Sequence, residues 1–218
     1  MTQFWNDVQV YGPGFLSAAW TVLWLTLLTI VVSWGFGLAA ALGQRSDMKA
    51  VRATAAFYVW FIRGTPALIQ IFIVYFGMPQ LGIRLTPYTA GVLALAINSG
   101  AYVTEIIRSG LSAIPIGQTE SALALGFSQR ETMRTIILPQ VFRIILPSIT
   151  NEALSTLKNT SLLSTITVVE LTLYAQTLIS ATFRPFDFYI AVAIIYLLLT
   201  TILTQLAAFF ERRYARLY

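Results

Sequence analysis

The chain has 218 residues, of which 57% are hydrophobic and only 11% are charged. A typical soluble domain carries about 25% charged residues, so this composition indicates an integral membrane protein. The sequence contains no cysteine and no histidine, which excludes disulfides, imidazole bases and the usual zinc ligands. We therefore predict no catalytic residue and no metal site. The net charge of +5 is expected to reflect basic loops beside a membrane, not binding to nucleic acid.

Long stretches without charge predict the membrane-spanning helices. Four intervals between successive charged residues each hold the ~20 apolar residues that cross a bilayer. The first such helix follows a segment without Lys or Arg and is longer than a secretory signal, so we expect it to be uncleaved. The four spans are predicted at residues 15–43, 53–78, 87–108 and 187–210.

A fifth span is predicted at residues 143–168, although this stretch is polar. Each ionisable group costs on the order of 3 kcal/mol at the centre of a lipid-facing helix, and the stretch contains both Glu152 and Lys158. The positions of the basic residues nevertheless require it to cross, because the loops rich in Lys and Arg should all be cytoplasmic. This gives five helices, with the N-terminus outside and the C-terminus in the cytoplasm. The basic clusters are Arg45, Lys49 and Arg52; Arg108, Arg130, Arg134 and Arg143; and Arg212, Arg213 and Arg216.

The cytoplasmic region 111–140 has more predicted structure than a simple connection. Pro115 and Gly117 should end the preceding helix, and residues 119–125 then form a short helix that ends at Gly126, a residue suited to a left-handed cap. Ser128 and Glu131 make an S-x-x-E capping box, which should begin a second helix that stops near Pro139. Because the short helix is mostly apolar, we expect a partner to cover it.

Several motifs in this order resemble those of a known family. Glu120-Ser-Ala, Gly126 and Ile137-Leu138-Pro139 resemble the E-A-A, G and I-x-L-P pattern of the membrane subunits of bacterial ABC importers. The stretches "FIRGTPALIQIFIVYFG" (61–77), "AYVTEIIRSGLSAIPIGQTESA" (101–122) and "LKNTSLLSTITVVEL" (157–171) are similar to the polar amino-acid branch. The resemblance runs from about residue 15 to 210, and one departure is Ser121 where the family usually has alanine.

The resemblance implies an all-α, type I permease fold whose short cytoplasmic helix couples the chain to a separate ATPase. The sequence has no P-loop, because neither Lys49 nor Lys158 follows glycine, so ATP and magnesium would be bound by two partner ATPase subunits. A second permease chain, identical or similar, and an extracytoplasmic solute-binding protein are the other implied partners, in the bacterial inner membrane. The coupling residues would be Thr119, Glu120, Ser121, Ala122, Leu123, Leu125, Gly126 and Phe127.

Polar residues within the spans are candidates for the substrate path or a gate. Glu152 can accept an amino group, and Arg63 or Asn98 can bind a carboxylate. Each also has a structural alternative: Arg63 can snorkel to the interface, Glu105 can pair with Arg108 one turn away, and Glu152 and Lys158 can pair inside the protein. Gly35, Ala39 and Gly43 form a small-residue face that lets another helix approach. The candidates are Arg63, Thr65, Asn98, Glu105, Asn151, Glu152, Lys158 and Asn159.

Two other classes of membrane protein compete with this interpretation. An ion-coupled secondary carrier or a channel would also use a polar helix within the membrane, but it has no need of the structured cytoplasmic region, and the chain shows no inverted repeat. An intramembrane enzyme would depend on Glu105 and Glu152, which are expected at different depths. An ABC importer permease for polar amino acids is therefore the predicted function.

Overall fold

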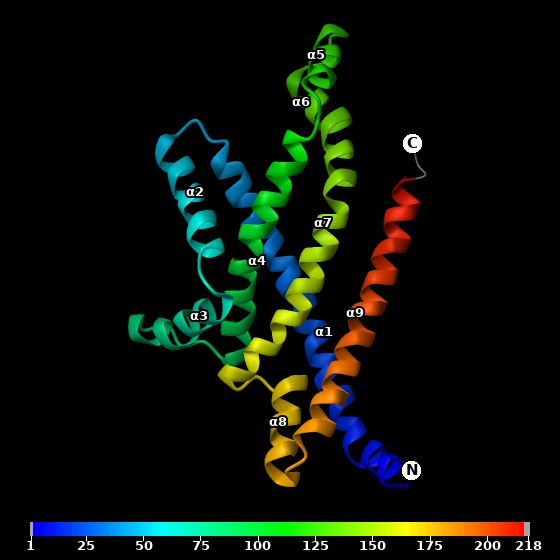
Figure 1. The fold of residues 1–218 in the computed structure, drawn as a ribbon. Helices are drawn as coiled ribbons and strands as arrows, with labels where there is room; N and C mark the ends of the chain where they lie inside the picture. Colours follow the sequence, from blue (N-terminus) through cyan, green and yellow to red (C-terminus); the bar gives the residue numbers. More distant parts are fainter. Residues whose placement is uncertain (1, 216–218) are drawn as a thin grey trace.

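The computed structural model describes the backbone of residues 2–215 and, except at residues 2–6, 210 and 213–215, their side chains. All regular secondary structure in this part of the chain is helical (Figure 1). In the predicted C-terminal basic cluster, Arg216 lies outside the described residues, and the side chain of Arg213 lies outside the described side chains. The elements are α1 (Thr2–Gln44), α2 (Lys49–Arg63), α3 (Ala67–Phe72), η1 (Ile73–Gly77), η2 (Met78–Leu81), α4 (Pro87–Ser112), α5 (Ile116–Ala124), α6 (Gln129–Glu131), η3 (Thr132–Ile137), α7 (Leu138–Asn159), η4 (Thr160–Ile166), α8 (Leu171–Thr182) and α9 (Pro185–Ala215).

The centre of the fold is the pair of long helices α1 and α4. The most apolar part of α4 is 72% buried inside the chain, whereas that of α9 is 6% buried, so α9 lies at the edge. The helices approach closely at Gly37, where an added Cβ would lie 2.4 Å from Val103. Of the predicted small-residue face, Gly43 lies against Ala55 of α2, but Gly35 has no neighbour within 4 Å. The predicted face therefore approaches α2 through Gly43, whereas the contact with α4 is made by Gly37 on a different face.

The predicted span 53–78 is not one straight helix. It is broken after Arg63, and the segment Ala67–Leu81 turns away from α2 by 112°. Gly64 and Pro66 explain the break, because proline lacks the N–H that continues a helix and glycine costs little to bend. Residues 73–77 adopt a π-helical form, which is common where a helix is distorted.

The helix after the capping box does not stop near Pro139, so that prediction is wrong. The chain stays helical from Gln129 to Ile166. A π-helical turn at 132–137 precedes α7, and the Leu138 N–H donates to the carbonyl of Met133, five residues earlier. Pro139 thus lies in the first turn of α7, where the missing N–H of a proline removes no α-helical hydrogen bond.

A short helix, α8, was not predicted. It follows a break at Thr167, whose φ is 64°, and it is inclined by 46° to the preceding helix. In the described chain, three helices are long and apolar enough to cross a membrane, or five if each bent pair counts as one span. Figure 1 shows α5 and the C-terminal end of α9 toward one end of the molecule, and α8 and the N-terminus toward the other.

Candidate functional site

The short helix α5 lies at one extremity of the molecule (Figure 1). Pro115 precedes its first turn, and the helix begins at Ile116, three residues before the predicted Thr119. Gly117 is therefore inside α5 and does not interrupt it. The first turn contains no acidic residue, because Glu120 is the fifth residue of α5.

The turn after α5 has the predicted left-handed glycine. Gly126 has a φ of 90°, its N–H donates to Leu123 O at 3.0 Å, and the Phe127 N–H donates to Ala122 O at 3.1 Å. These two bonds form a Schellman motif, which ends a helix sharply. The predicted capping box is also confirmed: Ser128 Oγ accepts from Glu131 N at 3.3 Å, and the Glu131 carboxylate accepts from Ser128 N at 2.9 Å. The Ser128 hydroxyl, which donates to Glu131 Oε2 at 2.7 Å, and the Ser128 N–H hold the pKa of the Glu131 carboxyl below its usual value.

The predicted coupling residues are mostly uncovered. Among the predicted coupling residues, only Ala122 is buried, and Thr119 is half-buried. Leu125 is 79% exposed, and Leu123 and Phe127 are also exposed. A helix that shows such apolar side chains beside exposed Glu120 and Ser121 has the character of a docking surface.

A charged cluster joins α2 to α4. Arg63 Nη1 lies 3.3 Å from Glu105 Oε2, and Arg108 donates to both oxygens of the same carboxylate, at 2.7 and 3.1 Å. The predicted pairing of Glu105 with Arg108 is thus confirmed. The Arg63 guanidinium also lies 5.5 Å from the centre of the Tyr102 ring. A pocket of about 520 Å³ is lined by Arg63, Glu105 and Tyr102 together with Gln44 and Trp60.

Asn98 and Thr65 belong to a separate, buried group. Asn98 Nδ2 donates to Gln70 Oε1 at 3.0 Å, and Thr65 Oγ1 accepts from Gln70 Nε2 at 2.8 Å. The amide donor of Asn98 is therefore engaged within the protein. Asn98 and Arg63 do not form one carboxylate-binding pair in this conformation, since Arg63 pairs with Glu105 instead.

The polar candidates of α7 lie on one side of the helix, because positions 151, 152, 158 and 159 follow the i, i+1, i+7, i+8 spacing of a single helical face. Glu152 is half-buried and lies within hydrogen-bonding reach of the hydroxyls of Ser99 and Thr156. Asn151 and Lys158 are exposed, and Asn159 is half-buried. The ion pairs of the described chain do not join Glu152 to Lys158. A polar surface along α7 is present, but the candidates from α2, α4 and α7 do not converge on one point.

A buried carboxylate, Glu170, was missed from the sequence. Its side chain is 0% exposed, and it accepts from Thr172 N and Leu173 N at 2.9 Å each and from Tyr196 Oη at 3.0 Å. It therefore caps α8 and joins it to α9. The available indication was an acidic residue directly before a helix-forming stretch, which is the N-cap position.

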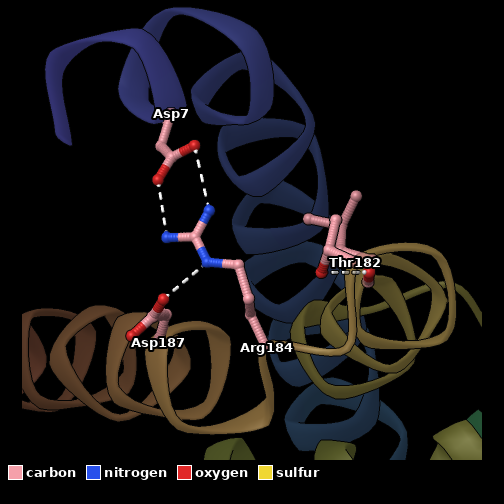
Figure 2. A network of polar contacts seen from close by, with 5 residues as sticks. Asp7, Thr182, Arg184 and Asp187 are labelled. Carbon is pink, nitrogen blue, oxygen red and sulfur yellow. Dashed lines mark hydrogen bonds and ion pairs between the residues drawn. The ribbon is translucent and has the colours of Figure 1, made fainter. Parts of the chain in front are cut away.

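An ion-pair network at the opposite end from α5 was also missed. Figure 2 shows the Arg184 guanidinium between two carboxylates: it donates to both oxygens of Asp7, at 2.8 and 3.3 Å, and to Asp187 at 2.7 Å. These contacts raise the pKa of Arg184 and tie the start of α1 to the turn between α8 and α9. Asp7 and Arg184 are 177 residues apart in sequence, so no local pattern indicates their pairing.

Comparison with known proteins identifies the family. Residues 33–216 match the family described as binding-protein-dependent transport system inner membrane component. This chain belongs to that family. It is 35% identical over 211 residues to the glutamine transport system permease protein GlnP of Escherichia coli, covering 96% of each chain. It is 36% identical over 209 residues to the nopaline transport system permease protein NocM of Agrobacterium fabrum, covering 91% of this chain and 87% of the relative.

Solved structures agree with this assignment. The crystal structure of an amino acid ABC transporter with histidines contains a chain that matches with a TM-score of 0.90 and 40% identity, over 95% of this chain and 97% of that one. An inward-facing MetNI methionine ABC transporter matches with a TM-score of 0.78 and 14% identity, over 94% and 98% of the two chains, which shows the shared fold. The family predicted from the sequence motifs is therefore confirmed.

Proposed function

We propose that this chain is the permease subunit of an ATP-driven ABC importer that carries polar amino acids into the bacterial cytoplasm. The observation that carries the proposal is α5, an exposed and partly apolar helix closed by the Gly126 turn, on a chain of the permease family. The glutamine and nopaline permeases among its relatives support polar amino acids and related compounds as the substrate class.

Five crossings give the arrangement that suits this role. If each bent pair is one span, the described chain would cross five times, and its first and last helices would then end on opposite sides of the membrane. The excess of Lys and Arg near α5 and near the end of α9 then assigns that side to the cytoplasm and the N-terminus to the outside. The inner membrane of a bacterium is the corresponding location.

The partners follow from the absence of an ATP-binding motif. Two ATPase subunits would bind ATP and magnesium, and each would receive one coupling helix, so the importer would contain two permease chains. A solute-binding protein would deliver the substrate from outside. Thr119 to Phe127 would provide the coupling surface, and α7 with Glu152 would line the path, together with the pocket at Arg63 and Glu105.

The first experiment isolates the complex and then perturbs α5. Purification in mild detergent should recover an ATP-hydrolysing subunit in equal amount, and the reconstituted complex should take up substrate only with ATP. Glu120→Lys and Gly126→Asp should abolish uptake while the chain remains in the membrane. Gly82→Asp is the matched control, because Gly82 has a similar φ of 83° and no neighbour within 4 Å. Normal uptake in both α5 variants would refute the coupling role.

The rival function is a secondary carrier or channel. It predicts that the chain purifies alone and moves substrate in vesicles without ATP. For the path itself, Glu152→Gln should reduce uptake of at least one amino acid, because the carboxylate would no longer pair with an amino group. Unchanged uptake of every accepted amino acid would remove Glu152 from the path.

A further inference from the structure

The carbonyls of Ile62 and Thr65 are among those that lose their usual helical donors at the break between α2 and α3. Pro66 has no N–H, so it cannot donate to the carbonyl of Ile62, four residues earlier. The N–H of Ile69 donates to Pro66 O at 3.1 Å, so the carbonyl of Thr65 also lacks its partner. Carbonyl groups left unpaired away from water are costly. A span broken in this way needs other donors.

The Gln70 side chain supplies these donors. Its Nε2 lies 2.8 Å from Ile62 O, 3.1 Å from Thr65 O and 2.8 Å from Thr65 Oγ1. The hydroxyl of Thr65 in turn donates to Phe61 O at 3.0 Å. Since two carbonyl oxygens face the same end of the Gln70 amide, that end must be the nitrogen. The orientation of the amide is thereby fixed.

The opposite end of the Gln70 amide is anchored to α4. Its Oε1 accepts from Asn98 Nδ2 at 3.0 Å, and the two residues are only 5% and 7% exposed. The helix α4 also carries Glu105, the partner of Arg63. One buried pair of amides therefore connects the backbone on both sides of Arg63 to the helix that holds the carboxylate of its ion pair.

We propose that Gln70 is the positioning residue of the broken span: it replaces the hydrogen bonds lost at Pro66 and, through Asn98, makes the break and α4 a single unit. Without it, α3 would lose its fixed direction relative to α2, and Arg63 would lose its alignment with Glu105. A leucine of similar size would fill the space but leave both carbonyls unpaired. The consequence for transport rests on the proposed function, whereas the consequence for the bend does not.

The bend can be measured directly because the sequence contains no cysteine. Cysteines introduced at Ala53 on α2 and Ile73 at the start of η1, both exposed, would be the only thiols of the chain. Spin labels on this pair, in the complete transporter in lipid nanodiscs, would report the distance across the break by pulsed electron resonance. The parent should give one narrow distance distribution.

Three variants of the labelled chain test the role of Gln70. Gln70→Leu removes all the side-chain bonds, and Gln70→Glu keeps the shape and the acceptor for Asn98 but removes the donors. Both should broaden the distribution and shift it to longer distances. Gln80→Leu is the matched control, because Gln80 is an exposed glutamine of the same segment, and it should match the parent. An unchanged distance distribution in the Gln70 variants would overturn the proposal. If the Gln70→Leu chain does not assemble into the transporter, the distribution of Gln70→Glu is by itself the test.

Uptake by the same variants separates this proposal from the proposed function. Each Gln70 variant should reduce ATP-driven uptake by at least about tenfold, the fold-change that corresponds to leaving a single buried group unpaired, and Gln70→Leu, which loses every side-chain bond, should reduce it the most. A parent complex without ATP-driven uptake would refute the proposed function, yet its distance distributions would still test Gln70. A bend that changes in the Gln70 variants with normal uptake would overturn the transport role of Gln70.

Discussion

Replacing Glu170 should destabilise the fold more than replacing any exposed acidic residue. The carboxylate is buried, and both of its oxygens accept hydrogen bonds. Oε1 accepts from Leu173 N, while Oε2 accepts from Thr172 N and from the Tyr196 hydroxyl. These three bonds join the start of α8 to α9. The change to be tested is Glu170→Ala, with Glu170→Gln and Tyr196→Phe as partial removals.

The structure gives a graded expectation for the three variants. Glu170→Ala removes the acceptor of two backbone N–H groups and one hydroxyl. Each buried group that loses its partner costs ~1–3 kcal/mol, and the three costs are not fully additive, so we expect the free energy of unfolding to fall by about 4 kcal/mol. The oxygen of Gln at position 170 can keep the bonds to Thr172 and Tyr196 and lose only the bond to Leu173, which should cost about 1.5 kcal/mol. Tyr196→Phe removes one hydroxyl bond and should cost about 1 kcal/mol.

The assay is the free energy of unfolding of the chain in mixed micelles, titrated with SDS and followed by circular dichroism. Glu120→Gln is the control, because Glu120 is exposed on α5 and should be neutral. The order of destabilisation should be Glu170→Ala, then Glu170→Gln, then Tyr196→Phe. The reasoning is refuted if Glu170→Gln and Tyr196→Phe both match the parent, or if Glu120→Gln costs as much as Glu170→Gln.

Three further predictions concern other parts of the chain. Gly37→Ala should cost about 1–3 kcal/mol by overpacking, because its Cβ would lie 2.4 Å from Val103, whereas Gly35→Ala should be harmless; equal stability of the two variants in SDS titration would contradict this. Arg184→Lys should lower stability measurably, since lysine keeps the charge but loses the two-pronged contact with Asp7; zero coupling between Arg184→Lys and Asp7→Asn in a double-mutant cycle would contradict this. The capping-box bonds lower the pKa of Glu131, so its contribution to stability is present above the ordinary glutamate pKa of about 4.3 and is lost as the pH falls through the lowered value. Amide-exchange protection of the turn, corrected for intrinsic rates, should therefore fall at acid pH in the parent but stay constant with pH in Glu131→Gln.

The features predicted correctly from the sequence are those determined by neighbouring residues. The Gly126 turn, the Ser128 and Glu131 capping box and the pairing of Glu105 with Arg108 all depend on groups within a few positions of one another. The family itself was identifiable because several local motifs occur in a fixed order. Local patterns also gave α4 its predicted start at residue 87.

Other features depend on helix direction, helix type or distant partners, which local sequence patterns do not carry. Hydropathy marks residues 53–78 as apolar but carries no information on direction; Gly64 and Pro66 indicate a kink, and only its size of 112° was not predicted. Pro139 indicates a helix end only if the preceding turn is α-helical, and the π-helical turn at 132–137 removes that condition. Asn98 was a substrate candidate because it is polar within a span, yet its donor is used by Gln70, 28 residues away.

The two broken spans share one physical solution. At Pro66 the backbone groups without helical partners are carbonyls, and the side-chain amide of Gln70 donates to them. At the start of α8 the groups without helical partners are N–H groups, and they donate to the carboxylate of Glu170. In both cases the side chain is buried and takes a second bond from another helix, α4 through Asn98 and α9 through Tyr196. Polar residues within a span therefore divide into those that supply missing hydrogen bonds to the backbone and those that remain available to a substrate. By this criterion Gln70 and Glu170 belong to the first class, with Asn98 holding Gln70 in place, and we expect Glu152, whose nearest partners are hydroxyl groups, to belong to the second.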